Sequence, residues 1–253
     1  MENKKLLYFN TIILVILLMV FSNAIEAEAE VTVKNTLDIS EQKNGLAWGE
    51  KEVYLTFDDA PGDKVTEEIL KVLKSHDIKG TFFIVGNRIK GREKILKQIV
   101  TEGHSIGLHS YSHKLKMIYS SKKVFIDEMQ KTSDEIYDNV GIRTYLIRFP
   151  GGSKPFMNKE FLDELHSYKF KIYDWNVAIS DGINAKFSPE RFYKEAINTR
   201  QFKSPLIILM HCSGENENTV QALPQIIEHY KSLGYNFKAL TIDSPEYYFR
   251  VKK

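Results

Sequence analysis

The sequence predicts an α/β fold in which a barrel of parallel strands is surrounded by helices. From residue 51 onward, short apolar runs alternate with amphipathic runs. The runs 80–86 and 205–211 are almost wholly apolar, which is typical of strands buried on both faces. About seven strand and helix units are predicted, which favours a closed (β/α) barrel over an open sheet. The chain has 253 residues, 43% of them hydrophobic and 27% charged, which suits one such domain.

Each strand is predicted from a short run of aliphatic, aromatic or β-branched residues bounded by turn residues. The first run, in 52–57, is followed by two adjacent carboxylates, and the run 205–211 ends at a histidine. We expect strands over residues 52–57, 80–86, 105–110, 144–149, 169–177, 205–211 and 235–241.

Each helix is predicted from apolar residues that recur every three or four positions. Val65, Ile69 and Leu73 form such a stripe, and Ser188 followed by Pro189 is typical of a helix N-terminus. We expect helices over residues 63–76, 92–103, 123–141, 158–168, 188–198 and 219–234.

The first 30 residues differ from the rest of the chain. A basic start precedes an apolar stretch from about Ile12 to Phe21, and small residues follow it. This order is typical of an export signal, although an uncleaved anchor is the alternative. The stretch is short for a membrane span, which needs about 20 residues. We predict a signal peptide or N-terminal membrane anchor over 1–30, so the remainder works outside the cytoplasmic membrane.

Residues 31–50 are polar with little periodicity, and we predict a linker or N-terminal extension that packs on the domain 51–253 through Trp48. The net charge of +2 is too balanced to favour nucleic acid as a partner. The single cysteine, Cys212, excludes an intrachain disulfide and a multi-cysteine metal site. Any membrane contact is expected only through the N-terminal segment.

Polar side chains recur where the predicted strands end. In α/β barrels the carboxyl ends of the strands form the active-site face, so these side chains are expected to meet at one rim. They are Asp58, Asp59, His109, Arg148, Asp181 and His211.

The stretch "HSYSH" places His109 and His113 four residues apart. On a helical turn this spacing puts both rings on one side. Two imidazoles and one carboxylate make a sound ligand set for a catalytic divalent metal with a free position. Of the adjacent pair Asp58 and Asp59, one carboxylate would bind the metal and the other would take a proton from water. The alternative for "DDAPG" is a plain turn, since Asp, Pro and Gly favour turns.

The order of these motifs resembles the polysaccharide deacetylase family, also called the NodB-homology domain or carbohydrate esterase family four, over about residues 52–241. Thr56–Asp59 is similar to its Thr-Phe-Asp-Asp motif, and His109–His113 to its His-Ser/Thr-x-x-His motif. "RFPGG", beginning at Arg148, and "LMH", ending at His211, resemble two later motifs. The resemblance implies a distorted (β/α) barrel of the NodB type, as a single catalytic domain.

The resemblance also implies catalytic roles. Asp58 would be the general base, held as a carboxylate by Arg148. His211 would be the general acid, oriented by Asp181, with Asp174 as the competing candidate for that task. The implied metal ligands are Asp59, His109 and His113.

Three residues are expected to contact substrate. The backbone N–H of Gly151 would help bind the oxyanion, Leu209 would line the acetyl-methyl pocket, and Tyr111 would contact sugar. Several positions depart from the family pattern: Ala60 replaces a usual glycine, and Gly182 stands where tryptophan is common.

The expected activity is metal-dependent removal of N-acetyl groups from a cell-wall glycan, above all from N-acetylglucosamine or N-acetylmuramic acid of peptidoglycan. Zinc is the expected metal, with cobalt, nickel or manganese as alternatives. The same site could run O-acetyl ester hydrolysis on xylan or another acetylated polysaccharide. A third possibility is a catalytically silent glycan-binding envelope protein. Its signature would be the loss of a ligand or of the base, and all of these residues are present.

Overall fold

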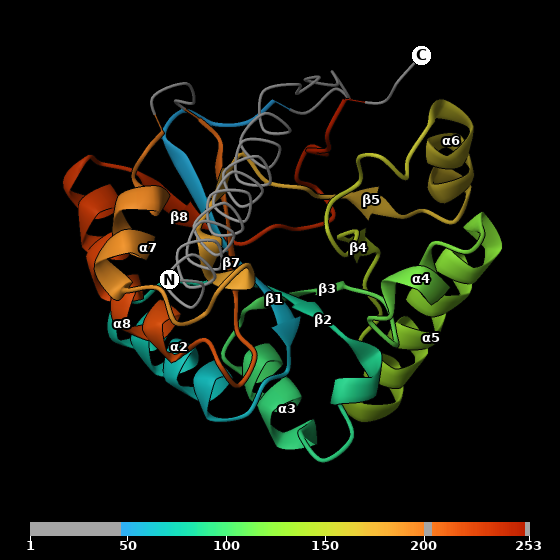
Figure 1. The fold of residues 1–253 in the computed structure, drawn as a ribbon, viewed down its shortest axis with the longest axis horizontal. Helices are drawn as coiled ribbons and strands as arrows, with labels where there is room; N and C mark the ends of the chain where they lie inside the picture. The colour runs from blue at the N-terminus through green and yellow to red at the C-terminus, as the bar shows by residue number, and fades with distance from the viewer. Residues whose placement is uncertain (1–46, 200–203, 251–253) are drawn as a thin grey trace, which may run out of the picture. The chain divides into compact units, whose positions relative to one another are not determined.

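A curled parallel sheet forms the centre of the domain that the structure describes. The computed structural model describes residues 47–199 and 204–250. Its strands are ordered β5-β4-β3-β2-β1-β7-β6, and β8 pairs with the start of β1 (Figure 1). All of these pairs are parallel. The strands are β1 (Glu52–Ala60), β2 (Thr81–Ile84), β3 (Ser105–Leu108), β4 (Leu146–Ile147), β5 (Lys171–Ile172), β6 (Val177–Ala178), β7 (Leu206–His211) and β8 (Asn236–Lys238).

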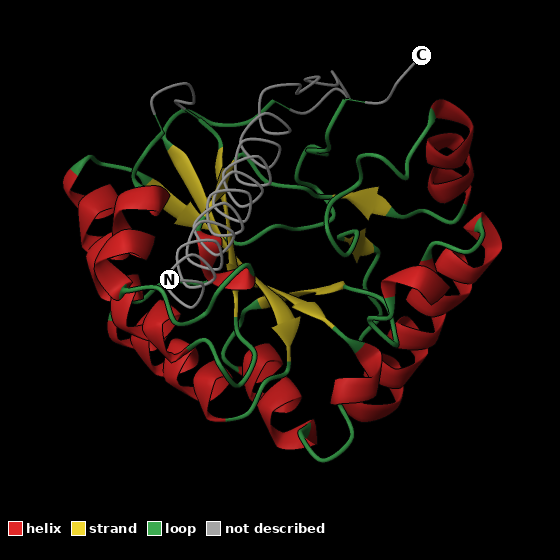
Figure 2. Ribbon diagram, in the orientation of Figure 1, coloured by secondary structure: helices red, strands yellow, loops and turns green. Residues whose placement is uncertain are grey.

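Helices cover the sheet at the left, bottom and right of Figure 2, and loops lie along its upper side. Their apolar faces pack on the strands, and α8 packs beside α2 and α7. This arrangement confirms the predicted α/β fold of distorted (β/α) barrel type. The helices are α2 (Lys64–Ser75), α3 (Glu93–Thr101), α4 (Leu115–Ile118), α5 (Lys122–Val140), α6 (Lys159–Ser167), α7 (Pro189–Ala196) and α8 (Glu217–Ser232). Two 3-10 turns are η1 (Gly86–Arg88) and η2 (Ser180–Gly182).

The central strand β1 is buried along almost its whole length. Its apolar side chains join one continuous core, in which the ring of Phe57 stacks on that of Phe82 at 5.0 Å. Burial of each such side chain stabilises the fold by roughly 1.5–3 kcal/mol. Because β2 and β7 both run parallel to β1, the carboxyl ends of these three strands emerge at the same rim.

The prediction of one strand over 169–177 is wrong. The segment contains two short strands, and they lie at opposite edges of the sheet: β5 pairs with β4, whereas β6 pairs with β7. Between them the chain crosses from one edge to the other, and Tyr173 forms an isolated parallel bridge with Tyr247. The carboxylate of Asp174 fixes this crossing, because it accepts hydrogen bonds from the backbone N–H groups of Ser153 and Phe249.

Other boundaries differ by a few residues. β1 continues through both carboxylates to Ala60, and the predicted strand 235–241 is reduced to β8. The short helix α4 was not predicted. None of the helices in the part of the chain that the structure describes is long and apolar enough to cross a membrane. The signal or anchor predicted over 1–30, and most of the predicted linker 31–50, lie outside the described residues.

Candidate active site and metal centre

Two consecutive aspartates at the end of β1 reach the same rim because the strand is irregular there. In a regular strand successive side chains point to opposite faces. Here the pairing with β2 shifts register between Phe57 and Ala60. Within this interval Asp59 has a φ of 72°, a left-handed value that is uncommon outside glycine. One extra residue in the strand is the signature of a bulge, and bulges re-aim side chains next to active sites.

Asp59, His109 and His113 each offer one ligand atom, and these atoms lie within 4.8 Å of one another. The Oδ1 atom of Asp59 is buried and accepts no hydrogen bond from the described residues. It lies 3.3 Å from His113 Nε2. An orphaned carboxylate oxygen facing imidazole nitrogens is costly without a cation, so this set fits a divalent metal.

His109 is positioned as a neutral ligand. Its ring is buried, and Nδ1 lies 2.9 Å from the backbone carbonyl of Arg148, which makes Nδ1 the donor and leaves Nε2 with a free lone pair. Burial lowers the pKa of His109 and outweighs the opposite effect of Asp58. A metal ligand needs the neutral imidazole, and a carbonyl that fixes the tautomer is the usual support for one.

The loop His109–His113 does not form a helical turn, on which a four-residue spacing would bring the two rings to one side. It is irregular, with φ values of 66° at Ser110 and 53° at His113. The Ser110 hydroxyl accepts a hydrogen bond from the His113 backbone N–H. The two imidazole rings nevertheless come together, with centroids 5.1 Å apart. Left-handed backbone, not helical spacing, brings them to one side.

Arg148 is fully buried and its guanidinium is held on all sides. One nitrogen donates to Asp58 Oδ1 at 2.9 Å and to the Thr56 hydroxyl at 2.7 Å. The other nitrogens donate to the backbone carbonyls of Tyr173 and Asp174. A guanidinium fixed in this way holds the Asp58 carboxylate in one orientation, and the pair neutralises two charges that would otherwise be costly to bury.

Asp181 contacts His211 twice. Asp181 Oδ1 lies 2.8 Å from His211 Nδ1, and Asp181 Oδ2 accepts from the His211 backbone N–H at 2.7 Å. The hydroxyl of Thr219 also donates to Oδ2. Burial lowers the pKa of His211, but the Asp181 carboxylate outweighs it, and the pKa is raised to about 9. His211 therefore carries a proton at neutral pH. The competing candidate, Asp174, bonds instead to Ser153 and Phe249.

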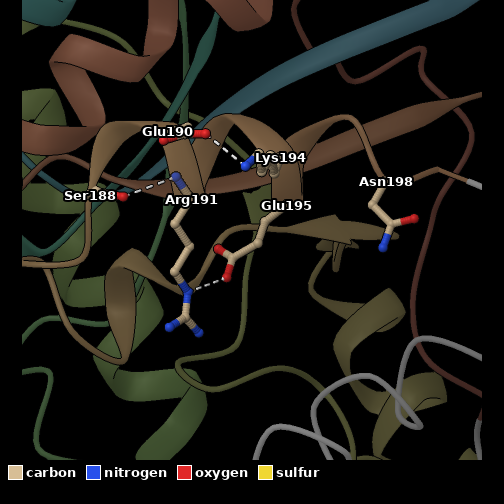
Figure 3. A pocket seen from close by; sticks show the side chains of 6 residues that line it. All are labelled: Ser188, Glu190, Arg191, Lys194, Glu195 and Asn198. Atoms are coloured by element: carbon tan, nitrogen blue, oxygen red, sulfur yellow. Dashed lines mark hydrogen bonds and ion pairs between the residues drawn. The ribbon is translucent and has the colours of Figure 1, made fainter.

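Sequence reasoning missed two carboxylates that support this site from outer helices. Glu195 of α7 accepts hydrogen bonds from the backbone N–H and hydroxyl of Ser180, the residue before Asp181. Figure 3 shows Glu195 also meeting Arg191, whose Nε lies 2.8 Å from its Oε1. The second, Glu128 of α5, is buried beside the loop that carries the histidines. It could have been noticed as a charged residue on an apolar helix stripe.

A cavity of about 360 Å³ opens at this rim. Four predicted site residues line it, together with residues of the η2 turn and of the loop after β7. Gly151, Leu209 and Tyr111, which we expected to contact substrate, are not among the lining residues. Gly151 is exposed and Leu209 is buried, and the Tyr111 ring lies 3.7 Å from Lys131 Nζ. The lining residues are Asp59, His113, Asp181, Gly182, Ile183, Asn184, Ala185, Lys186, His211, Ser213, Glu215 and Asn216.

Comparison with known proteins gives consistent matches. The model of the family described as polysaccharide deacetylase matches residues 47–173. A putative polysaccharide deacetylase of Bacillus subtilis, YheN, is 31% identical over an alignment covering 90% of this chain and 87% of the relative. A peptidoglycan-N-acetylglucosamine deacetylase of Bacillus cereus is 33% identical, over 75% of this chain and 69% of the relative.

A solved structure has the same fold. It is the catalytic domain of peptidoglycan N-acetylglucosamine deacetylase from Eubacterium rectale, which superposes with a TM-score of 0.74 at 31% identity. The superposition covers 82% of this chain and 96% of the other.

Proposed function

The chain belongs to the polysaccharide deacetylase family, and we propose that it is a metal-dependent enzyme that removes N-acetyl groups from peptidoglycan. The observation that carries this proposal is the pairing of an Asp-His-His metal set with a separate acid and base. Asp58, held by Arg148, and His211, held by Asp181, lie side by side on neighbouring strands. The preferred position of attack is N-acetylglucosamine, which the names of the Bacillus cereus relative and the Eubacterium rectale structure both specify. N-acetylmuramic acid is the alternative.

Asp59, His109 and His113 would hold the cation. When bound, a divalent metal supplies positive charge that polarises the acyl carbonyl and acidifies water. Two imidazoles and one carboxylate favour zinc, with cobalt, nickel or manganese as alternatives. The proton transfers would be carried out by the side chains around this triad of metal ligands, Asp59, His109 and His113.

Asp58 would be the general base. Its Oδ1 is occupied by Arg148, and its Oδ2 lies 3.6 Å from His109 Nε2, so Oδ2 faces the triad. In this position it accepts the proton of the water that attacks the acetyl carbon. Arg148 stays buried and charged throughout, and so keeps Asp58 oriented for that transfer.

His211 would be the general acid. Because Nδ1 is held by Asp181, Nε2 is the nitrogen available to substrate, and the raised pKa keeps it protonated. An amine leaves an acyl centre readily only when its nitrogen receives a proton. An alkoxide from an O-acetyl ester needs this assistance less. The acid held by Asp181 therefore favours N-deacetylation over ester hydrolysis on xylan, and a complete set of groups argues against a silent protein.

We also propose that the protein acts outside the cytoplasmic membrane, where this substrate lies. The export pattern of residues 1–30 supports this location.

The test is acetate release by the purified protein from peptidoglycan, N-acetylglucosamine oligomers and acetylated xylan, with and without a chelator. Mass spectrometry of the muropeptides then assigns the deacetylated sugar. We expect chelator-sensitive release from peptidoglycan at N-acetylglucosamine. Acetate release from xylan alone would show that the protein is an O-acetyl esterase. Loss of acetyl groups from N-acetylmuramic acid would assign that sugar, and not N-acetylglucosamine, as the substrate position. Undiminished activity in the presence of chelator would contradict the metal dependence.

A further inference from the structure

The two histidines of the metal triad sit at the ends of a loop whose backbone needs external support. Ser110 and His113 have φ values of 66° and 53°, and neither is glycine. Residues other than glycine adopt this left-handed region of backbone conformation mainly where the surrounding structure enforces it. Whatever enforces the loop conformation therefore sets how the two imidazoles face the cation.

Much of that support comes from one side chain, Glu128 of α5. A single oxygen, Oε2, accepts three hydrogen bonds from the centre of the loop. The donors are the backbone N–H of Tyr111 at 3.0 Å, the backbone N–H of Ser112 at 2.7 Å and the hydroxyl of Ser112 at 2.9 Å. Glu128 is only 5% exposed, so these bonds are shielded from water. Hydrogen bonds to an ionised acceptor in such a place are short and strong.

Neighbouring residues of α5 hold the same loop. The sulfur of Met129 lies 3.4 Å from the Ser110 backbone nitrogen, and Lys131 Nζ lies 3.7 Å from the centre of the Tyr111 ring. These contacts are individually weaker than those of Glu128. The loop is also held by η1, where the backbone N–H groups of Gly86 and Asn87 donate to the Ser110 and Tyr111 carbonyls. Among side chains, Glu128 of α5 makes the principal contacts with the loop.

We propose that Glu128 is a positioning residue for the metal centre. Its carboxylate fixes the loop between His109 and His113 in the strained conformation in which both rings reach the cation. Glu128 does not itself touch the metal or the substrate. The inference rests on the proposed metal role of the triad, and it adds that the affinity for the metal is set partly from α5.

The test compares zinc and cobalt affinity in the wild type, Glu128→Ala and Glu128→Gln. Affinity is measured by competition with a chromophoric chelator, and the visible spectrum of the cobalt-loaded protein reports ligand geometry. Loss of a residue that orients metal ligands typically weakens metal binding by about 10- to 100-fold, and we expect Glu128→Ala to fall in this range. Glu128→Gln retains an acceptor oxygen without the charge, so it should recover part of the affinity and of the wild-type spectrum.

Ile136→Ala is the matched control. Ile136 is a fully buried core residue two turns further along α5, so its loss lowers stability without touching the loop. We expect a lower melting temperature and unchanged metal affinity in this variant. A second readout needs no metal: hydrogen exchange of the Tyr111 and Ser112 amides should accelerate in both Glu128 variants and stay slow in Ile136→Ala.

The outcomes separate the two proposals. If the wild type binds no metal, the metal-dependent function fails. If the wild type binds metal and a folded Glu128 variant binds it equally well, only the positioning role is overturned. If Glu128→Ala does not fold, Glu128→Gln decides, because weaker binding with faster amide exchange supports the role and wild-type values for both overturn it.

Discussion

Asp58 and His211 are register partners near the carboxyl ends of the adjacent parallel strands β1 and β7. The backbone continues the pairing past the strand end, where the N–H of Cys212 donates to the Asp58 carbonyl at 3.0 Å. The proposed base and the proposed acid are thus spaced by the sheet itself, at roughly 4.8 Å between strands. Side chains on rigid strands hold such a spacing more firmly than side chains on loops.

Substitution of the proposed base tests the first half of this pair. In Asp58→Asn the amide oxygen still accepts from Arg148, but the group no longer accepts a proton from water. We expect kcat for acetate release to fall by about 10²- to 10⁴-fold with metal content unchanged. Asp63→Asn is the control, because Asp63 is an exposed aspartate paired with Arg92 at the surface. Wild-type kcat in folded Asp58→Asn would remove Asp58 from the mechanism.

The dependence of activity on pH tests the role of His211 as the acid. A general acid works while protonated, so activity should fall as the pH rises through the pKa of His211, which its surroundings raise to about 9. Asp181 is the main cause of the raised pKa, opposing the effect of burial. In Asp181→Asn the alkaline limb should therefore move to lower pH. Profiles of kcat against pH for both proteins make the comparison, and coincident alkaline limbs would contradict the assignment.

Metal binding should raise the thermal stability of the folded protein. A ligand that binds only the folded state stabilises it by mass action, by about 2.7 kcal/mol at a hundredfold excess over Kd. We expect zinc to raise the melting temperature of the wild type and chelation to reverse the effect. His113→Ala, which removes one member of the triad, should lose this response, whereas His229→Ala on α8 should keep it. An equal response in both variants would place the metal elsewhere.

The sequence was sufficient to predict the alternation of strands and helices and the rim where the polar residues meet. Both depend on short-range patterns: apolar periodicity, and the position of Asp58, His109 and His211 directly after apolar runs. Family membership, predicted from the motifs, is confirmed by the comparisons. The motif order also predicted that Asp181 lies beside His211, whereas Gly151 and Leu209, predicted in the same way, do not line the cavity.

The remaining features depend on backbone geometry and distant contacts. The bulge requires a positive φ at Asp59, and no glycine at that position indicates it in the sequence. The break in 169–177 arises because Asp174 is bound by Ser153 and Phe249, which lie far from it in sequence. Likewise the role of Glu128 depends on its hydrogen bonds to Tyr111 and Ser112, which precede it by 17 and 16 residues.

Acid should destabilise the fold through His104. Burial, reinforced by Lys79, lowers the pKa of this histidine from 6.5 to about 4. Between these values the unfolded chain binds a proton that the folded chain does not, so stability falls as the pH drops from about 6.5 to 4. The full effect is about 3 kcal/mol, at 1.36 kcal/mol per unit. Urea unfolding at pH 7 and at pH 4.5 measures it.

His104→Asn is the informative variant for this effect. The ring Nδ1 accepts from the Gly80 backbone N–H at 3.1 Å, and the asparagine oxygen can take that place without titrating. The variant should lose less stability than the wild type between the two pH values. An identical loss in both proteins would assign the acid sensitivity to other groups.

A single methyl group beside His211 should impair catalysis. Gly182 stands where the family resemblance led us to expect tryptophan, and a Cβ there would lie 2.4 Å from His211 Cε1. The backbone of Gly182 is not left-handed, so alanine is tolerated by the main chain and the clash falls on the imidazole. We expect Gly182→Ala to fold, to bind metal normally and to lose kcat because the ring is displaced from Asp181. Gly214→Ala is the matched control, since a Cβ at Gly214 meets no atom within 4 Å. Equal kcat in the two variants would show that the close approach of Gly182 to His211 has no part in placing the acid.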